Sequence, residues 1–356
     1  MKMTVFMLSA ILLLASCAED NGIDKKGLSM KTNTEGNTAA NSAADKAPAE
    51  YGFTTSSTVA DVVSNPAFGD FGHLLFPVDR NISGSMTLAD ISSSNVYVWY
   101  SHIRTEKTVE IINRLYHDAL AGNRIFYRMY SDAEIAADPS KADTGLFLFR
   151  GETGKPFAIT NAGGGFMYVG AMHDSFPHSL EISKAGYNAF ALIYRPDDPY
   201  SDLAKAIEFI HDNADALGVK ADDYSLWGGS AGARMAAILG NRAYLQQLTG
   251  RTDIPQAATV VMQYTGYSTA SQYDAPTYVC VGSNDGIASW RTMQNRLMRL
   301  EEMGIPTEFH VYDGLGHGFG LGEGTCAEGW IYDALRFWQK NMSAEPGTGV
   351  PPLYAD

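Results

Sequence analysis

A serine flanked by glycines at residues 228–232 limits the possible folds of this chain more than any other segment. The segment reads Gly-Gly-Ser-Ala-Gly and lies between a short apolar run at 224–227 and a run of small residues at 233–239. In this setting a G-x-S-x-G segment forms a sharp turn from a strand into a helix, because Cβ atoms at the glycine positions would collide with neighbouring backbone. We therefore expect the Ser230 hydroxyl to stand clear of a sheet at the N-terminus of a helix. A glycine-rich turn with an incidental serine is the alternative interpretation.

From residue 144 onward, strand-like and helix-like patterns alternate. Short strands are predicted at 146–150, 157–160, 189–194, 224–227, 259–264, 277–281 and 308–312. Helices are predicted at 202–217, with Ser201 as N-cap and Gly218 as stop, and at 233–239, 290–303 and 330–340. Such alternation predicts an α/β fold with a mostly parallel sheet and helices on both faces. Binding sites in such sheets lie at the carboxyl ends of the strands.

Three consecutive glycines follow the predicted strand at 157–160. They lie in Asn-Ala-Gly-Gly-Gly-Phe at 161–166, and no Lys-Ser/Thr pair follows them as in a nucleotide-binding loop. Consecutive glycines let backbone N–H groups turn toward one point, where they can bind a developing oxyanion. We expect Gly164 and Gly165 to donate from this loop, and Ala231 to donate from the turn after the serine. A flexible turn without this role is the alternative.

An aspartate and a histidine follow two later strands. Asp285 lies in a Gly-Ser-Asn-Asp-Gly segment, and His317 lies among glycines after the last predicted strand. Each residue alone is also compatible with an ordinary loop. The order Ser230, Asp285, His317 is the chain order that a strand-helix hydrolase requires, so the three are predicted to form a catalytic triad. Asp274 is a competing candidate for the acid.

With these motifs, the sequence resembles the α/β-hydrolase superfamily, and within it the hormone-sensitive-lipase-like carboxylesterases and bacterial acetyl esterases. Residues 163–166 are similar to the HGGG[FW] oxyanion motif, although Ala162 replaces the histidine. Residues 229–232 are similar to the nucleophile turn, with Gly229 at a position where aspartate is common. Tyr-Arg-Pro at 194–196 is similar to the family's strand end before a helix. The resemblance covers about 144–340.

The resemblance implies a serine carboxylic-ester hydrolase, acting on short acyl esters such as acetyl groups on carbohydrates. It implies no cofactor, and no metal-binding spacing is evident. Near the glycine loop, Phe166, Met167 and Tyr168 are expected to line the substrate pocket. His173 and His178 could contact substrate, but buried structural histidines are the expected interpretation. A serine peptidase of the same fold and a non-catalytic envelope binding protein are the alternative functions.

The N-terminal residues predict export. Residues 1–16 have a basic start and an apolar run too short to span a bilayer, and Leu-Ala-Ser-Cys at 14–17 resembles the bacterial lipobox. The resemblance implies lipidation of Cys17 and a membrane anchor in the bacterial envelope, with acidic residues at 19–20 favouring the outer membrane. A plain secretory signal is the alternative. The rest of 17–50 has the composition of a disordered tether.

The segment 51–143 is an N-terminal extension or cap. It is rich in aromatic residues and contains a predicted helix at 108–121, ended by Gly122. It either packs a small core of its own on the catalytic domain at 144–342 or overhangs the active site. A Pro/Gly-rich tail follows at 343–356.

The charge and the cysteines add two expectations. The net charge is −14 and no basic stripe is present, which excludes nucleic acid as a partner class. Cys280 lies in an apolar strand-like run, and we expect it and Cys326 to be free thiols rather than a disulfide.

Overall fold

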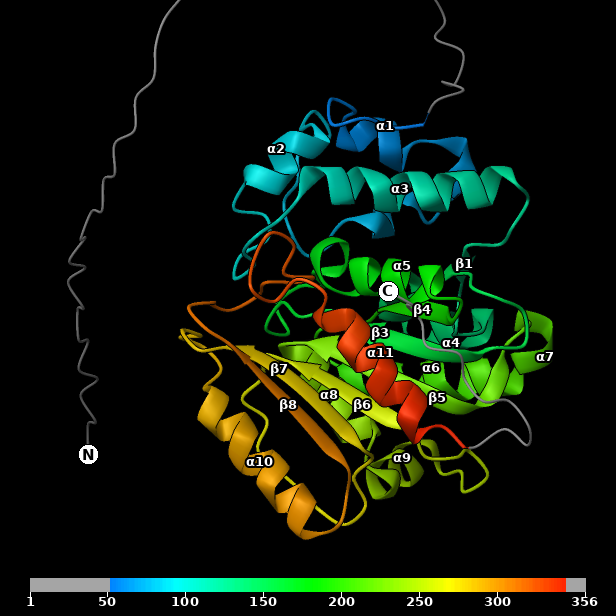
Figure 1. Ribbon diagram of the computed structural model, residues 1–356. Coiled ribbons are helices and arrows are strands. Elements are labelled where there is room, and N and C mark those ends of the chain that lie inside the picture. Colours follow the sequence, from blue (N-terminus) through cyan, green and yellow to red (C-terminus); the bar gives the residue numbers. More distant parts are fainter. Residues whose placement is uncertain (1–51, 344–356) are drawn as a thin grey trace, which may run out of the picture. The chain divides into compact units, whose positions relative to one another are not determined.

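The predicted alternation of strands and helices is present in the computed structural model, which describes residues 52–343 (Figure 1). Within that range, one sheet has the order β1-β2-β4-β3-β5-β6-β7-β8. Pairs from β4 through β3 to β8 are parallel, while β1 and β2 form an antiparallel edge. The strands are β1 (Phe126–Tyr127), β2 (Gly145–Phe149), β3 (Pro156–Asn161), β4 (Asn188–Ile193), β5 (Lys220–Gly229), β6 (Thr259–Gln263), β7 (Thr277–Gly282) and β8 (Thr307–Tyr312).

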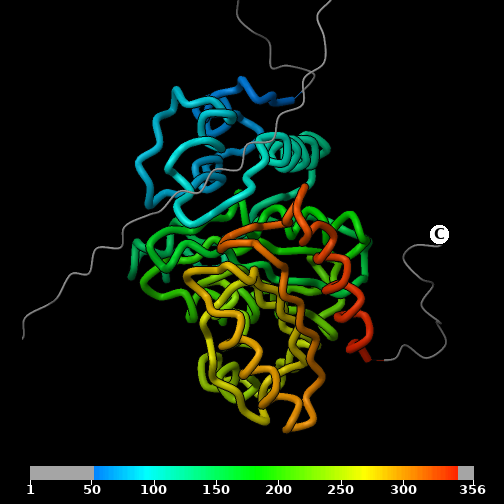
Figure 2. The backbone as a smooth tube through the Cα atoms, turned by 60° about the vertical axis from the view of Figure 1, so that its left-hand side comes forward, coloured from blue at the N-terminus to red at the C-terminus, as the bar shows by residue number. Residues whose placement is uncertain are grey.

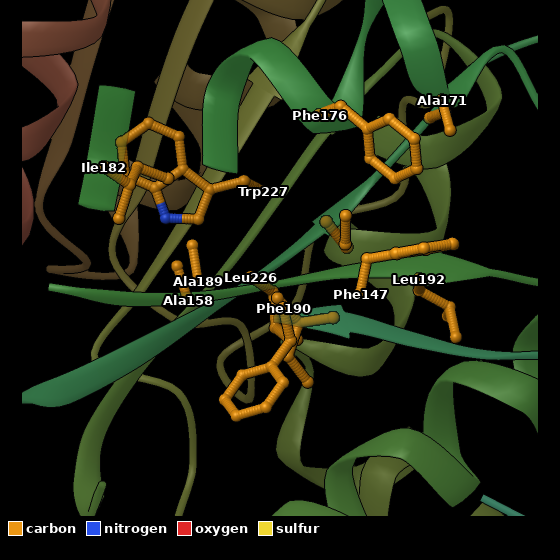
Figure 3. Packing of buried hydrophobic residues seen from close by; sticks show 14 of the residues in the cluster. Phe147, Ala158, Ala171, Phe176, Ile182, Ala189, Phe190, Leu192, Leu226 and Trp227 are labelled. Carbon is orange, nitrogen blue, oxygen red and sulfur yellow. The ribbon is translucent and has the colours of Figure 1, made fainter. Parts of the chain in front are cut away.

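The burial of the strands explains why they are apolar along their whole length. Every residue of β2, β3, β4, β6 and β7 is buried, as expected when helices cover both faces of a sheet. In Figure 3 the side chains of Trp227 and Phe176 lie on one side of the strands and the Phe190 ring lies on the other. Strand β8 is at the edge of the sheet and its residues are only partly buried.

Helices cover the sheet from both sides. Helices α5 and α11 contact each other and the central strands, while α6, α8 and α9 form a second group, and α10 packs along β7 and β8 (Figure 1). The helices are α1 (Val59–Val63), α2 (Leu88–Ser93), α3 (Thr105–Leu120), α4 (Asp132–Ala137), α5 (Ser175–Lys184), α6 (Pro199–Asp212), α7 (Ala214–Leu217), α8 (Ala231–Leu239), α9 (Arg242–Thr249), α10 (Trp290–Glu302) and α11 (Trp330–Asn341).

Two helix predictions need correction. The predicted helix at 202–217 is two helices, α6 and α7, separated at Asn213. Helix α6 also begins earlier, with Pro199 in its first turn and Asp198 as N-cap, so Ser201 lies inside the helix. A proline is favoured at the first helical position because its missing N–H would be unpaired there in any case. Gly218 ends α7 in a left-handed conformation, as predicted.

Residues 52–125 form a helical layer that packs on the α/β part through α3 and α5 (Figure 2). The layer has an aromatic cluster of its own, in which the rings of Phe53 and Tyr116 are 5.2 Å apart and those of Phe53 and Phe68 are 6.0 Å apart. The next residues, in β1, join the main sheet beside β2. The predicted boundary at residue 143 therefore falls after the chain has already entered the sheet.

Several expectations fall on residues outside the described range. These are the signal peptide at 1–16, lipidation of Cys17, the tether to residue 50 and nearly all of the tail at 343–356. Among the residues that are described, Cys280 and Cys326 are free, as predicted, with Cys280 buried and Cys326 exposed. No helix within 52–343 has the length and apolar character needed to cross a membrane.

Candidate active site

The serine lies on a strained turn between β5 and α8. Ser230 has φ 51° and ψ −114°, a left-handed conformation that costs on the order of 1–3 kcal/mol for a residue with a side chain. The turn is held by close backbone packing, because a Cβ on Gly232 would overlap the carbonyl oxygen of Asn161 at the end of β3. The glycines of this segment are therefore needed for packing, as the sequence indicated.

The structure brings the three predicted triad residues together. Nε2 of His317 lies 3.0 Å from Oγ of Ser230, and Nδ1 of His317 lies 2.8 Å from Oδ2 of Asp285. The side chain of Asp285 is fully buried and that of His317 is 8% exposed. This geometry lets the imidazole accept the serine proton while the carboxylate fixes its tautomer.

Asp285 is oriented by its own turn. Its Oδ1 accepts hydrogen bonds from the backbone N–H groups of Ile287 (2.8 Å) and Ala288 (2.7 Å), which leaves Oδ2 for His317. The competing acid, Asp274, instead accepts a bond from Nη2 of Arg296 at 2.7 Å. Asp285 is therefore the carboxylate in contact with the histidine.

The glycine loop after β3 packs against the serine. A Cβ on Gly163 would lie 2.9 Å from the Ser230 Cβ, and Gly164 has φ 124°. Within residues 52–343, the N–H groups of Gly164, Gly165 and Ala231 donate to no protein acceptor. Free donors at the end of a strand and at a helix N-terminus can bind the oxygen of a tetrahedral intermediate.

The predicted pocket residues differ in their exposure. Met167 is 64% exposed and Phe166 is half-buried, with its ring 6.0 Å from that of Tyr200. Tyr168 is fully buried and its hydroxyl already donates to the carbonyl of Val98 at 2.5 Å, so the structure assigns its hydrogen bond to the protein.

His173 and His178 are buried beside this loop, in agreement with the structural interpretation. Burial lowers the pKa of each ring to about 3, so both are neutral at ordinary pH. Nε2 of His173 and both ring nitrogens of His178 have no hydrogen-bond partner among the described residues. The His173 ring instead packs edge-on against Tyr97, with centroids 4.0 Å apart.

Sequence reasoning missed a buried carboxylate, Asp174, which lies between the two histidines in the chain. Its Oδ2 accepts from the Gly163 N–H (2.7 Å) and the Tyr100 hydroxyl (3.0 Å), and its Oδ1 accepts from the Tyr264 hydroxyl (3.2 Å). Burial raises the pKa of Asp174 to about 6, against the lowering effect of these hydrogen bonds. No sequence motif links the three donors, which come from distant parts of the chain.

The N-terminal layer contributes a second set of missed contacts through residues 99–101. The Ser101 N–H donates to the Gly318 carbonyl at 2.9 Å, and the Ser101 hydroxyl donates to the His317 carbonyl at 3.1 Å. Trp99 has φ 76°, is 41% exposed and stacks on Tyr168 beside the glycine loop. The layer thus contacts both the histidine loop and the glycine loop. The density of aromatic residues was the only signal for this in the sequence.

No cluster of His, Cys, Asp and Glu side chains within 52–343 is arranged to hold a metal ion. The groups that the structure brings together at the site are Ser230, His317, Asp285 and the free backbone donors.

Comparisons with known proteins agree with this architecture. The BD-FAE family model matches residues 149–285, which is less than half of the 356-residue chain. No curated protein matches the chain significantly.

Two solved structures are similar. An acetyl ester-xyloside bifunctional hydrolase from Caldicellulosiruptor lactoaceticus has 18% sequence identity and a TM-score of 0.52, over 60% of this chain and 95% of that one. A thermophilic esterase from Thermogutta terrifontis, with propionate bound, has 17% identity and a TM-score of 0.52, over 62% of this chain and 96% of that one. Together with the parallel sheet and the nucleophile turn, these likenesses show that the chain has the α/β-hydrolase fold.

Proposed function

We propose that this protein is a serine hydrolase that cleaves carboxylic esters of short acyl groups through an acyl-enzyme. The observation that carries this proposal is the hydrogen-bonded series Ser230 Oγ–His317 Nε2 at 3.0 Å and His317 Nδ1–Asp285 Oδ2 at 2.8 Å. A serine hydroxyl is a weak nucleophile at neutral pH and needs such a base.

The reaction follows from the geometry. His317 takes the proton of Ser230 as Oγ attacks the ester carbonyl, and Asp285 stabilises the imidazolium without taking the proton itself. The amides of Gly164, Gly165 and Ala231 then bind the carbonyl oxygen as it gains negative charge, and each such donor typically contributes about 10²–10³ in rate. His317 protonates the leaving alcohol, and water repeats the same steps to release the acid.

For the substrate we propose acetyl or similarly short acyl esters, including esters on carbohydrates. One similar structure is named an acetyl ester-xyloside hydrolase and another was solved with propionate, a three-carbon acid, which supports a short acyl group. These names describe those proteins.

For the location we propose the bacterial envelope, with a lipid on Cys17 anchoring the enzyme to a membrane, the outer membrane being favoured. Only the sequence of residues 1–20 supports this part of the proposal. Metabolic labelling with a clickable fatty acid, in wild type and in Cys17→Ser, tests it.

The test of activity is Ser230→Ala. We expect hydrolysis of p-nitrophenyl acetate to fall by about 10⁴–10⁶, as in other triad enzymes, because the nucleophile is lost. Ser85→Ala, at an exposed serine of the N-terminal layer whose hydroxyl bonds that of Ser83, is a matched control and should keep full activity. Acetate, propionate and butyrate esters, and acetylated xylo-oligosaccharides, would then define the acyl and alcohol preferences.

Two other outcomes would favour other functions. Faster turnover of aminoacyl nitroanilides than of esters would favour a peptidase. Failure of a fluorophosphonate to label Ser230 in folded wild-type protein would favour a non-catalytic binding protein. Undiminished ester hydrolysis by Ser230→Ala would overturn the proposal.

A further inference from the structure

Asp174 is a buried carboxylate that the reaction above does not use. Its side chain is fully buried, and its three hydrogen-bond donors come from the glycine loop (Gly163), from the N-terminal layer (Tyr100) and from the end of β6 (Tyr264). Its one ion-pair contact among the described residues is with Nε2 of His178 at 3.9 Å, and that ring is neutral because burial lowers its pKa to about 3. A buried charge without a countercharge is costly, so residues of this kind concentrate at functional sites.

The carboxylate also packs against the serine turn. A Cβ on Gly229, the residue before Ser230, would overlap both carboxylate oxygens of Asp174 and lie 2.7 Å from its Cγ. Gly163, whose N–H the carboxylate accepts, immediately precedes the predicted oxyanion donors. Tyr264 has its ring centroid 4.9 Å from that of His317. One side chain therefore contacts the serine turn, the glycine loop and the tyrosine that packs on the catalytic imidazole.

The ionised form of Asp174 can accept from all three groups at once, the Gly163 N–H and the hydroxyls of Tyr100 and Tyr264. An ionised carboxylate only accepts hydrogen bonds, whereas a protonated one would place an O–H against a donor. Burial, and next the charge of Asp174, raises the pKa of the Tyr100 and Tyr264 hydroxyls well above 10, so both remain donors. The Gly163 N–H and the two tyrosine hydroxyls are therefore donors suited to a negatively charged Asp174 carboxylate.

We propose that Asp174 is a positioning residue for ester hydrolysis, whose ionised carboxylate holds the glycine loop and the serine turn so that the Gly164 amide and the Ser230 hydroxyl reach the same carbonyl group. This inference rests on the proposed function. It assigns Asp174 no contact with substrate.

A pH dependence follows from this role. Besides Tyr100 and Tyr264, the titratable groups facing Asp174 are His178, His317, Tyr168, Tyr194 and Cys280. The pKa of Asp174 is raised to about 6 by burial, and the Tyr100 hydrogen bond opposes that rise. Removing the Tyr100 hydroxyl raises this pKa further, so the acid limb of the kcat profile should move to higher pH in Tyr100→Phe.

The first experiment replaces the charge while keeping the shape. We expect Asp174→Asn to lower kcat for p-nitrophenyl acetate by about 10–100-fold, with KM within about threefold of wild type, because misplacement of reacting groups by a fraction of an ångström slows the chemical step. Asp223→Asn is the control, since Asp223 is also a buried carboxylate but lies near the opposite end of β5 and bonds Lys220. It should keep kcat within about twofold.

The second experiment is a double-mutant cycle on the contact between residues 174 and 229. Gly229→Ala places a methyl group on the carboxylate and should lower kcat about 10–100-fold in the wild-type background, but less than threefold in an Asp174→Ala background, where the contact is gone. An equal loss in both backgrounds would overturn the inference.

The third experiment uses a mild variant that needs no change at Asp174. Tyr100→Phe should shift the acid limb to higher pH, while Tyr97→Phe should not, because the Tyr97 hydroxyl has no partner among the described residues. An unmoved limb in Tyr100→Phe, unchanged kcat in Asp174→Asn, or a KM effect without a kcat effect would each refute the positioning role. Absence of ester hydrolysis in the wild type would refute the proposed function instead, so the two failures are distinguishable.

Discussion

Two buried aspartates illustrate how contacts at single atoms separate a candidate acid from a structural ion pair. Asp274 precedes strand β7 and Asp285 follows it, and the sequence left both open as partners of the histidine. Asp285 bonds Nδ1 of His317, whereas Asp274 bonds Arg296 and the backbone N–H of Ser271. The difference lies in which loop faces the imidazole, and that depends on the path of the whole sheet.

We therefore expect Asp285→Asn to lower kcat by about 10⁴, because an amide in place of the carboxylate favours the wrong tautomer of His317. Asp274→Asn, the matched change at the other aspartate, should leave kcat within a few-fold. Steady-state kinetics with p-nitrophenyl acetate measures both, and a larger kcat loss at 274 than at 285 would contradict the assignment of the acid.

The sequence predicted Ser230, Asp285 and His317 as a group because each follows a strand and their order suits the fold. It could not predict Asp174, whose donors lie 74, 11 and 90 residues away in the chain. Neither period nor motif relates such distances. Only the packed structure shows that Gly229 leaves the space that this carboxylate fills.

At the scale of elements, the predictions were best where glycine ends a helix or where a strand is apolar throughout. Helix α10 ends close to the predicted position, before Gly304. Helix α5 was missed because nine of its ten residues are buried, polar ones included, so it has no polar face to reveal a helical period. The N-terminus of α6 was misplaced because Pro199, rather than Ser201, starts the helix.

Helix α10 also depends on a buried ion pair. The Arg296 side chain is 1% exposed, and it donates to Oδ1 of Asp274 at 2.7 Å and to the Thr269 carbonyl at 2.9 Å. Removing one partner leaves the other charge buried and unpaired, so Arg296→Ala should lower the free energy of unfolding by about 3–5 kcal/mol. Gln294→Ala, at an exposed position of the same helix, should change it by less than about 0.5 kcal/mol. Urea denaturation measures both values, and similar losses would argue against the pair as an anchor of α10.

For the whole molecule, two buried histidines and one buried aspartate govern how stability responds to acid. The pKa of His173 and of His178 is lowered by burial from 6.5 to about 3, so the unfolded chain binds more protons than the folded one between these values. Above pH 6.5 both rings are neutral in the folded and the unfolded chain. Below that pH the unfolded chain takes up protons that the buried rings do not, so the free energy of unfolding decreases. Asp174 acts in the opposite direction, because its pKa is raised from 3.8 to about 6. The cost of burying its charge is therefore relieved on acidification between those two values.

As the pH is lowered from 7 to 5, the two histidines together decrease the free energy of unfolding by more than Asp174 increases it. The midpoint of thermal unfolding should therefore fall over this range. His178→Leu, which removes one buried titrating ring without removing any hydrogen bond to a described residue, should flatten this decline. His117→Gln, at an exposed site on α3, should not. Differential scanning calorimetry across this pH range makes the comparison. An equally steep decline in His178→Leu would mean that other groups govern the acid response.

The N-terminal layer was the part of the whole molecule that the sequence described least. Its aromatic residues fitted either a separate small core or a cap over the site, and the structure contains features of both. Phe53, Phe68 and Tyr116 form a cluster within the layer, while Ser101 bonds the backbone of the loop that carries His317. Aromatic composition alone cannot distinguish a ring that packs inside a layer from one that lies beside a glycine loop.

The bond between the hydroxyl of Ser101 and the backbone of His317 joins positions 216 residues apart. The proposed base is therefore held by a residue of the N-terminal layer, which lies outside the sheet. Heat, a neighbouring mutation or proteolysis of its loops could each loosen that layer. We expect such loosening to lower turnover before the sheet unfolds.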